Sequence, residues 1–392
     1  MTDNAISAPD VDTLRAWRHD FHQHPETAFE EHRTSRRIAE ILTEAGIEFI
    51  TGLGGGTGIV ATLQGRRGPG RSIGLRADID ALDVTELSDA AHASTTPGKM
   101  HACGHDGHTT MLLGAACQLA RDPDFAGRVH FIFQPAEESE GGGRVMVEEG
   151  LFERFPMEAV YGVHNWPGLA IGEAAVHDTA VMAAFDVFTL TLQGKGCHAA
   201  MPHLGTDAIL AACQLVSQLQ GLISRETPAH QTAVLSVTQF HAGDAFNVIP
   251  ETVELRGTLR CFDEPLRAHL QQRFHEAVES LAQFHGLSAN LDYQPRYPAT
   301  INVPEHAERC AEILDSLPGI TQVHRDLPPS MASEDFAFML NARPGAYIWL
   351  GNGEESAALH NPHYDFDDRL TPIGVDYWVQ LVQHLLGDRP AP

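Results

Sequence analysis

The sequence predicts an α/β fold in which an α/β/α sandwich domain is interrupted by a smaller inserted α+β domain. Short apolar runs alternate with helical segments toward both ends of the chain, which is typical of a sheet covered by helices on its two faces. Strands with strict two-residue alternation occupy the middle of the chain and indicate an antiparallel sheet with one solvated face. The length of 392 residues fits two or three domains of about 150 residues each.

The two outer parts of the chain supply the elements of the larger domain. Residues 11–46 are expected to form two helices broken near Pro25, with Gly46 at the end of the second. A last helix is expected to be capped by Thr371 and to end at Gly387. The expected buried strands are 59–63, 73–75, 129–133, 159–163 and 346–350, and a further helix is expected at 109–119.

The middle of the chain supplies the elements of the inserted domain. Its two alternating runs are 185–193 and 253–261, and its two amphipathic helices are expected at 206–222 and 266–285. The buried-strand pattern resumes only near residue 345. The expected domains are therefore 1–184 together with 298–392, and 185–297 as the insertion.

Composition narrows the class of protein. Asp and Glu number 52 against 26 Lys and Arg, and the resulting net charge of −26 repels phosphate backbones, so nucleic acid is not an expected partner. No apolar run reaches the roughly 18 residues of a membrane span, and the N-terminus does not resemble a signal peptide. The six cysteines include no CxxC pair, which favours a reducing compartment. We therefore expect a cytoplasmic protein without a membrane partner, and its 23 histidines provide material for a metal site.

The segment from Met100 to His108 carries the strongest chemical signal. Cys103 and His105 are two residues apart, so both side chains would leave an extended segment on the same side. A thiolate and an imidazole at this spacing suit a borderline-soft ion such as zinc. The alternative is a buried free cysteine beside a surface histidine. Four potential ligands within eight residues leave the two interpretations evenly matched.

Two adjacent carboxylates, Glu137 and Glu138, follow the expected strand 129–133. Neighbouring side chains of an extended chain point in opposite directions, so one would bind a metal while the other faces a substrate. A solvated acidic loop is the alternative. The position favours a site, because ligands bind at the carboxyl ends of the strands in open α/β sheets.

Other strand ends carry further candidate ligands. His164 ends a buried strand, and His360 lies in a polar loop after the last one. Asp78 and Asp80 leave the same side of a strand end, which suits binding a metal or orienting a ligand histidine. Taken singly, these residues also fit a core histidine or an acidic turn. Together they form the distribution that a metal site built from strand ends requires, and the sequence contains no HExxH or EF-hand motif.

With these motifs the chain resembles the zinc-type metallopeptidase clan that includes aminoacylases and glutamate carboxypeptidase. The nearest branch is the group of hippurate hydrolases, N-acyl-amino-acid amidohydrolases and auxin-conjugate hydrolases. The strings that carry the resemblance run in family order along nearly the whole chain: His19–Glu26 (HDFHQHPE), Leu75–Leu82 (LRADIDAL), Met100–Thr109 (MHACGHDGHT), Gln134–Glu138 (QPAEE), Gly162–Pro167 (GVHNWP), Gly194–Pro202 (GKGCHAAMP), Asn247–Pro250 (NVIP), Ser333–Phe336 (SEDF) and His360–Phe366 (HNPHYDF).

The resemblance implies a catalytic domain around a dinuclear metal site, interrupted by a lid or dimerisation domain. Glu137 would act as general base and Asp80 would support a ligand. His198 would polarise the scissile carbonyl, often from the partner subunit. Asn247 and Arg260 would hold the free carboxylate of the substrate, although without the resemblance Arg260 would be placed on the solvated face of a strand. The implied metal ligands are Cys103, His105, Glu138, His164 and His360.

The implied reaction is metal-dependent hydrolysis of the amide bond of small N-acyl amino acids, hippurate-like or N-acetylated, to a carboxylic acid and a free amino acid. Two divalent ions per chain are implied, zinc first and otherwise manganese, cobalt or nickel, in a homodimer or homotetramer. The alternatives are a dipeptidase or carboxypeptidase on the same scaffold and a non-catalytic metal-binding protein, and retention of Glu137 and His198 argues against the last. Departures from the family pattern at Cys197, at Asp83 and in residues 84–97 touch no implied ligand and bear on substrate choice.

Overall fold

The computed structural model describes residues 9–138 and 140–387 and contains two compact units. The first unit comprises residues 1–181, 301–328 and 335–392, and the second comprises residues 182–300 and 329–334. The boundaries expected for the insertion, 185 and 297, lie three residues inside the second unit at each end. Residues 329–334 join that unit from a distant part of the chain.

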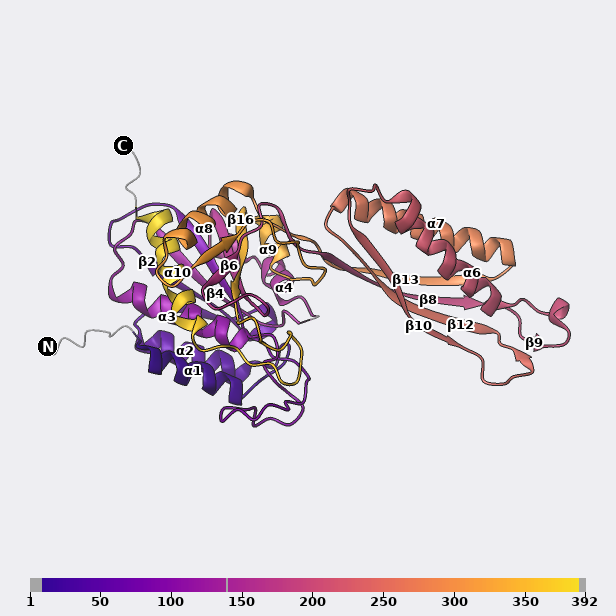
Figure 1. Cartoon of the computed structure of the whole chain (residues 1–392), viewed down its shortest axis with the longest axis horizontal. Helices are drawn as coiled ribbons and strands as arrows, with labels where there is room; N and C mark the ends of the chain where they lie inside the picture. Colours follow the sequence, from indigo (N-terminus) through magenta and orange to yellow (C-terminus); the bar gives the residue numbers. More distant parts are fainter. Residues whose placement is uncertain (1–8, 139, 388–392) are drawn as a thin grey trace. The chain divides into compact units, whose positions relative to one another are not determined.

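An eight-stranded mixed sheet forms the centre of the first unit, as the predicted α/β class requires (Figure 1). The strand order is β1-β2-β4-β3-β5-β16-β6-β15, and the four neighbours β4, β3, β5 and β16 run parallel to one another. Their carboxyl ends therefore meet at one edge of the sheet. The strands are β1 (Glu48–Leu53), β2 (Gly58–Gln64), β3 (Ser72–Asp78), β4 (Arg128–Gln134), β5 (Ala159–Trp166), β6 (Glu173–Ala175), β15 (Gln322–His324) and β16 (Gly345–Gly351).

Helices cover both faces of this sheet. Alternate strand residues such as Leu75, Phe131 and Tyr161 share a fully buried core with one set of helices. Their neighbours, including Ile132 and Val160, are buried on the opposite face. The first set is α1 (Val11–Gln23), α2 (His32–Glu44), α3 (His105–Arg121), α8 (Pro304–Ser316) and α10 (Leu370–Leu386), and the shorter helices are α4 (Gly142–Glu148), α5 (Leu151–Arg154) and α9 (Ala337–Ala342).

The expected helices and buried strands of this unit are confirmed, but the cap assigned to Thr371 is wrong. Helix α10 begins at Leu370, after Arg369, so Thr371 already lies inside the first turn. A residue in that position cannot adopt the extended conformation that lets a cap side chain reach back to the first amides. Its buried hydroxyl has no hydrogen-bond partner within the described part of the chain.

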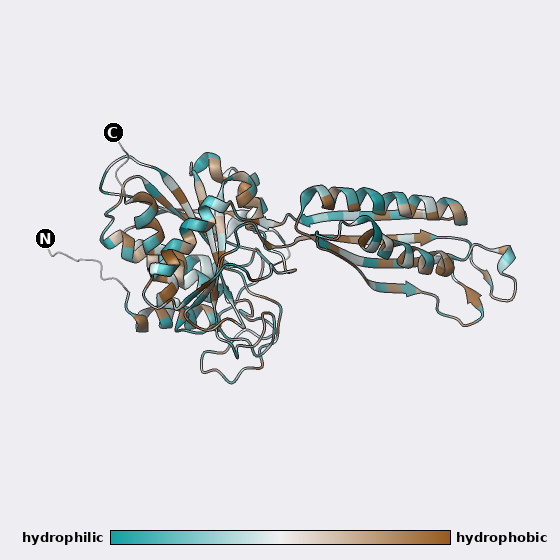
Figure 2. Ribbon diagram, turned by 45° about the horizontal axis from the view of Figure 1, so that its top comes forward, coloured by the Kyte–Doolittle hydropathy of each residue, from teal (hydrophilic) through white to brown (hydrophobic). Residues whose placement is uncertain are grey.

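The second unit is an antiparallel sheet with two helices on one face (Figure 1). The strand order is β10-β12-β8-β13, and Phe188, Leu190 and Leu255 point toward the helices while their neighbours alternate outward. The ribbons of the two helices show the matching hydrophobic and hydrophilic stretches (Figure 2). The elements are β8 (Ala184–Gln193), β10 (Ala233–Ala242), β12 (Thr252–Cys261), β13 (Ser288–Tyr297), α6 (Ala208–Gly221) and α7 (Glu264–His285). Strands β8 and β12 and both helices lie at or near the expected positions, whereas β10 and β13 were not among the expected strands.

Two further pairs of short strands complete the description. They are β9 (Cys197–His198) with β11 (Val248–Ile249), and β7 (Ala180–Met182) with β14 (Thr300–Ile301). Among the described residues, no helix combines the length and apolarity needed to cross a membrane.

Candidate metal centre

The expected ligands gather at the edge of the sheet where the four parallel strands end. His164 lies near the end of β5, Asp80 just beyond β3, and Glu138 just beyond β4. His360 follows β16, and Cys103 precedes helix α3, which begins with His105. Ligand atoms of Cys103, His105 and His164 lie within 4.8 Å of one another, as do those of Cys103, Glu138 and His360.

Cys103 and His105 converge for a reason that differs from the expected one. The segment is not extended, because His105 is the first residue of α3 and Gly104 has a φ of 91°. A side chain at Gly104 would collide with the Asn165 amide and lie 2.6 Å from the Tyr364 hydroxyl. The turn at this glycine therefore brings the thiol and the imidazole together.

The expectation that Glu137 and Glu138 point in opposite directions is wrong. Strand β4 ends at Gln134, and Ala136 has a φ of 53°, which bends the chain before the two glutamates. Ligand oxygens of both residues lie within 4.8 Å of a His105 nitrogen. Both carboxylates consequently face the same centre, Glu137 buried and Glu138 more accessible.

Asp80 contacts two of the expected ligands, His105 and Glu138. Its backbone oxygen and its Oδ1 lie 2.9 and 3.2 Å from Nδ1 of His105, and its Oδ2 accepts the Glu138 backbone N–H at 2.9 Å. Burial opposes the charge on His105, but Asp78, Asp80 and Glu138 outweigh burial and raise the pKa of His105 to about 10. The centre therefore favours a positive charge at this position.

His164 is held in a similar way but remains neutral. Its Nδ1 donates to the backbone oxygen of Asn165 at 2.6 Å, while Nε2 lies 3.4 Å from the Cys103 sulfur. Burial, with the nearby His108 and His105, lowers the pKa of His164 well below its usual value. Burial and the surrounding carboxylates also keep the pKa of the Cys103 thiol well above its usual value.

The donor set fits divalent metal ions. Within the described residues, Nε2 of His105 is buried without a hydrogen-bond partner, and Oε1 of Glu138 is buried with His105 and His360 as its ion-pair neighbours. Such atoms are expensive to bury unless something else satisfies them, and a cation would do so. Nε2 of His360 lies 3.2 Å from the same Glu138 oxygen, and its backbone, at a φ of 65°, is tied to Ala102. Sulfur, nitrogen and carboxylate donors together suit zinc and similar ions.

His108, counted among the potential ligands in the sequence, is used by the protein itself. Its Nδ1 lies 2.6 Å from Asp78 Oδ1, and its Nε2 accepts the Asn165 backbone N–H at 3.0 Å. Both ring nitrogens of His108 are therefore occupied, and the side chain links Asp78 to the backbone next to His164. Counting potential ligands along the chain does not separate this role from ligation.

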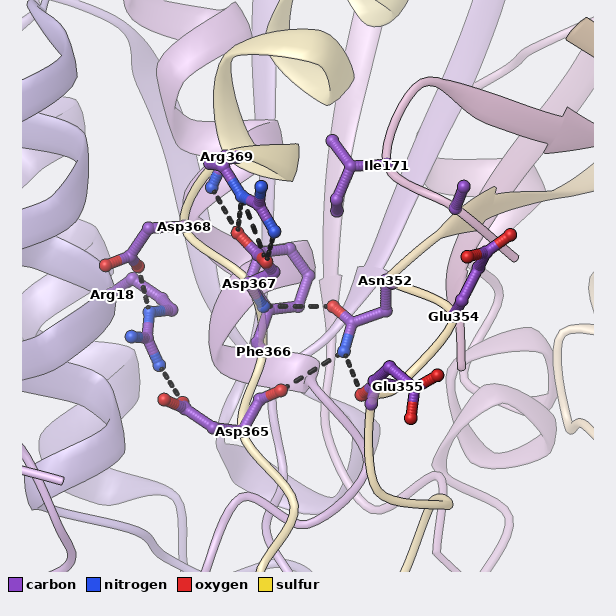
Figure 3. A pocket seen from close by; sticks show the side chains of 13 residues that line it. Arg18, Ile171, Asn352, Glu354, Glu355, Asp365, Phe366, Asp367, Asp368 and Arg369 are labelled. Carbon is purple, nitrogen blue, oxygen red and sulfur yellow. Dashed lines mark hydrogen bonds and ion pairs between the residues drawn. The ribbon is translucent and has the colours of Figure 1, made fainter. Parts of the chain in front are cut away.

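The buried Arg18 forms ion pairs with carboxylates that lie on the segments carrying the expected ligands. No role for Arg18 was predicted from the sequence. The Arg18 guanidinium lies 2.8 Å from Asp365 and 2.6 Å from Asp368 (Figure 3). It also lies 3.3 Å from Asp106, which directly follows His105. Asp365 belongs to the loop that carries His360. One buried cation thus ties α1 to both ligand-bearing segments, and the string HDFHQHPE that begins at His19 lies directly after it.

The unusual segment 84–97 contributes to the same cluster. Nε2 of His92 lies 3.0 Å from Asp365, and Glu86 lies 3.4 Å from Nε2 of His22. His22 in turn bonds Asp106 at 2.8 Å. Segment 84–97, which departs from the family pattern, therefore contacts residues that surround the expected metal centre and not the expected ligands themselves.

The second unit brings His198 and Asn247 together. His198 pairs with Val248 across the β9–β11 ladder, and the Ala199 N–H donates to the Asn247 backbone oxygen at 3.0 Å. Both residues are exposed. Nδ1 of His198 accepts the Ala200 N–H at 3.1 Å, so Nε2 carries the proton of the neutral ring.

Arg260 is half-buried and is not a freely solvated side chain. Its Nη1 donates to the Met331 backbone oxygen at 2.7 Å and to Ser333 Oγ at 2.9 Å, and the guanidinium lies 4.4 Å from the centre of the Phe185 ring. Burial lowers the pKa of Arg260. The solvated-strand alternative does not describe this residue.

Comparison with known proteins agrees with the fold and the donor set. A family described as Peptidase family M20/M25/M40 matches residues 74–384. The chain is 36% identical over 366 residues to an N-acetylcysteine deacetylase of Bacillus subtilis, covering 93% of this chain and 94% of the relative. It is 36% identical over 364 residues to a hippurate hydrolase of Campylobacter jejuni, with the same two coverages.

A solved structure gives the same picture. The chain superimposes with a TM-score of 0.84 on a dinuclear metal binding peptidase of the M20 family from Bacillus subtilis, at 33% identity and covering 96% of this chain and 98% of that one. Fold and site thus define a hydrolase of amide bonds on a dinuclear metal-binding scaffold. The chain belongs to peptidase family M20/M25/M40.

Proposed function

We propose that the protein hydrolyses N-acyl amino acids to a carboxylic acid and a free amino acid. The observation that carries the proposal is the buried carboxylate of Glu137, which faces the same centre as the metal donors while Glu138 faces His360 and Cys103. A carboxylate beside a metal centre is the arrangement that metal-assisted hydrolysis uses for proton transfer. The N-acyl amino acid substrates named for the two curated relatives support the substrate class.

The proposed ligands are Cys103, His105, Glu138, His164 and His360. When bound, two divalent ions, of which zinc suits the donors best, lower the pKa of water and polarise an amide carbonyl. Glu137 then accepts the proton of the attacking water and delivers it to the nitrogen of the leaving amine. Asp80 keeps His105 in the orientation that points Nε2 at the centre.

His198 is proposed to stabilise the tetrahedral oxyanion. The tautomer that its contact with Ala200 favours places a proton on Nε2, as a donor to a developing negative charge requires. His198 lies in the second unit, away in sequence from the ligands, so we propose that it acts in a dimer. Exposed apolar side chains of the same unit, Phe240, Phe246 and Val248, support an interface there.

Arg260 and Asn247 are proposed to bind the substrate carboxylate. A chain of charge −26 repels an anionic substrate, so a local cation is needed. Nη1 of Arg260 is already engaged, and no described residue accepts a hydrogen bond from its Nε or Nη2. Those two groups form a fork suited to a carboxylate.

The second unit, with the insertion expected at 185–297, is proposed to be the lid or dimerisation domain, and the first unit the catalytic domain. We also propose a cytoplasmic location. All six cysteines are free, Cys213 is exposed, and none is paired for an oxidising compartment.

A substrate panel tests the proposed reaction. The zinc-loaded protein is assayed on N-acetyl, N-benzoyl and indole-acyl amino acids, their amino-acid amides, and dipeptides. We expect N-acyl amino acids to be hydrolysed and their amides to be poorer substrates. A preference for dipeptides would favour the dipeptidase or carboxypeptidase alternative, and no turnover of any substrate would favour a metal-binding protein.

Matched glutamate variants test the roles at the centre. Glu137→Gln is expected to retain two ions per chain and to lose most of kcat, because an amide cannot accept the water proton. Glu138→Gln is expected to lose metal affinity as well. Variants that both keep their metal and their rate would contradict the proposed roles.

Two further variants test the second unit. Arg260→Ala is expected to lower kcat/KM for N-acyl amino acids by about 2–5 kcal/mol of transition-state binding and to affect their amides much less. Inactive His198→Ala and Glu137→Gln protomers, mixed and exchanged, are expected to regain partial activity. Equal Arg260→Ala losses on acids and amides would contradict the carboxylate role, and silent mixed dimers would place His198 in its own chain.

A further inference from the structure

The turn that carries Glu137 is held at both of its stems by one buried carboxylate, that of Asp335. Gln134, the last residue of β4, donates from Nε2 to both Asp335 oxygens at 2.8 and 2.9 Å. On the other side of the turn, the Gly143 N–H in the first turn of α4 donates to Oδ2 at 2.7 Å. Asp335 therefore crosslinks the strand before the glutamates to the helix after them.

Arg76 balances the charge of Asp335 and extends the crosslink into the sheet. Its guanidinium is fully buried and donates to Asp335 Oδ1 at 2.9 Å, to Gln134 Oε1 at 2.8 Å and to Asp78 Oδ2 at 2.8 Å. Asp78 also holds His108. A buried network whose members all find partners fixes side-chain positions more tightly than isolated pairs do.

The network contacts Glu137 directly, and it depends on the absence of a side chain at Gly143. The Asp335 backbone N–H donates to Glu137 Oε1 at 3.3 Å, so the residue that fixes the stems also contacts the glutamate. A Cβ at position 143 would lie 2.9 Å from Gln134 Oε1 and 3.1 Å from Asp335 Cγ. The network thus closes only where Gly143 leaves room for it.

We propose that Asp335 is a positioning residue that fixes the Glu137 carboxylate for proton transfer. The proposal rests on the proposed function, in which Glu137 accepts the proton of water. Proton transfer needs donor and acceptor held near hydrogen-bonding distance, and a displacement of about 1 Å lowers a rate by roughly a hundredfold. The string SEDF thereby gains a role for its aspartate.

Asp335→Asn tests the proposal with the full-length, zinc-loaded enzyme. The amide keeps the shape of the carboxylate but replaces one acceptor oxygen with an NH2 donor. In either orientation of the amide, this donor faces other donors: Gly143 and Gln134 at the Oδ2 position, or Gln134 and Arg76 at the Oδ1 position. We expect kcat to fall by about 10- to 100-fold, KM to stay within about threefold, and two ions per chain to remain. In metal-free protein, hydrogen exchange of peptides that cover residues 135–145 should become faster.

Asp186→Asn in the second unit is the matched control. Asp186 is equally buried and bonded to Arg267 and Tyr293, so its loss should lower the melting temperature while kcat stays within about threefold. Gly143→Ala disturbs the same network from the other side and is expected to reproduce the kcat pattern. It also serves if Asp335→Asn does not fold.

The outcomes separate the two proposals. In a Glu137→Gln background Asp335→Asn should cause no further loss of kcat, because the two residues act on one step. Full kcat with unchanged exchange in a folded Asp335→Asn or Gly143→Ala protein, while Glu137→Gln is inactive, would overturn the positioning role alone. Loss of the ions in both network variants would overturn it as well. Full activity of Glu137→Gln would instead overturn the proposed function.

Discussion

The buried pair of His22 and Asp106 leads to a prediction about stability and pH. Nδ1 of His22 lies 2.8 Å from the Asp106 carboxylate, and neither side chain is exposed. Burial opposes the charge on His22, but Asp106 and Glu86 outweigh burial and raise the pKa of His22 to about 9. Protonated His22 therefore stabilises the folded chain.

The sign and size follow from the difference between the folded and unfolded pKa values. A folded pKa of about 9 against an unfolded value near 6.5 gives about 3 kcal/mol of stabilisation, at about 1.4 kcal/mol for each unit. Because the folded pKa is the higher one, this contribution is fully present below pH 6.5 and is lost as the pH rises through 9. His22→Gln removes it.

The assay compares the free energies of unfolding of metal-free wild type and His22→Gln from pH 6 to pH 10. We expect the difference between the two proteins to shrink by about 3 kcal/mol across this range, since the other titrating groups are common to both. The effect should persist in 0.5 M salt, because buried pairs are screened weakly. A difference that is constant with pH, or that grows as the pH rises, would refute the reasoning.

Three further predictions concern residues at or next to the expected metal ligands. Cys103→Ser should weaken metal binding in a titration, whereas Cys117→Ser, inside α3 and away from the donors, should leave it unchanged. Gly104→Ala should lower both metal affinity and melting temperature, because a Cβ collides with Asn165 at a φ of 91°; an unchanged ion content would contradict this. Arg18→Met should destabilise the fold by about 3–5 kcal/mol in urea unfolding, because it leaves buried Asp106 without its guanidinium partner, and a loss below 1 kcal/mol would show that His22 suffices.

The larger part of the fold could be predicted because its signals are local. Apolar runs such as 129–133 and 159–163 are long enough to indicate buried strands, and the alternation at 253–261 indicates a sheet with one open face. The donors could be predicted for a related reason. Parallel neighbours end at one edge, so polar residues that follow separate strands meet there.

The networks around the centre could not be predicted from such signals. Arg18 lies 88 residues from Asp106, and Arg76 lies 259 residues from Asp335, so no periodicity links the partners. Helical spacing alone cannot tell that Arg18 is buried and charged inside the core. Convergence of Glu137 and Glu138 depends on a φ of 53° at Ala136, a conformation that alanine rarely adopts and that its sequence does not announce.

Three histidines in the two units bond to the protein through one ring nitrogen and leave the other ring nitrogen available. His105, His164 and His198 each bind the protein through Nδ1, to Asp80, to the Asn165 backbone oxygen and to the Ala200 N–H. For His105 and His198 this leaves Nε2 without a hydrogen-bond partner among the described residues, and for His164 it directs Nε2 toward the Cys103 sulfur. A ring fixed at one nitrogen has lost its rotational freedom before any ligand binds, so less conformational entropy is lost on binding. The buried networks through Arg18 and Arg76 extend the same principle to the backbone, because they fix the segments from which His105, Glu137 and His360 project.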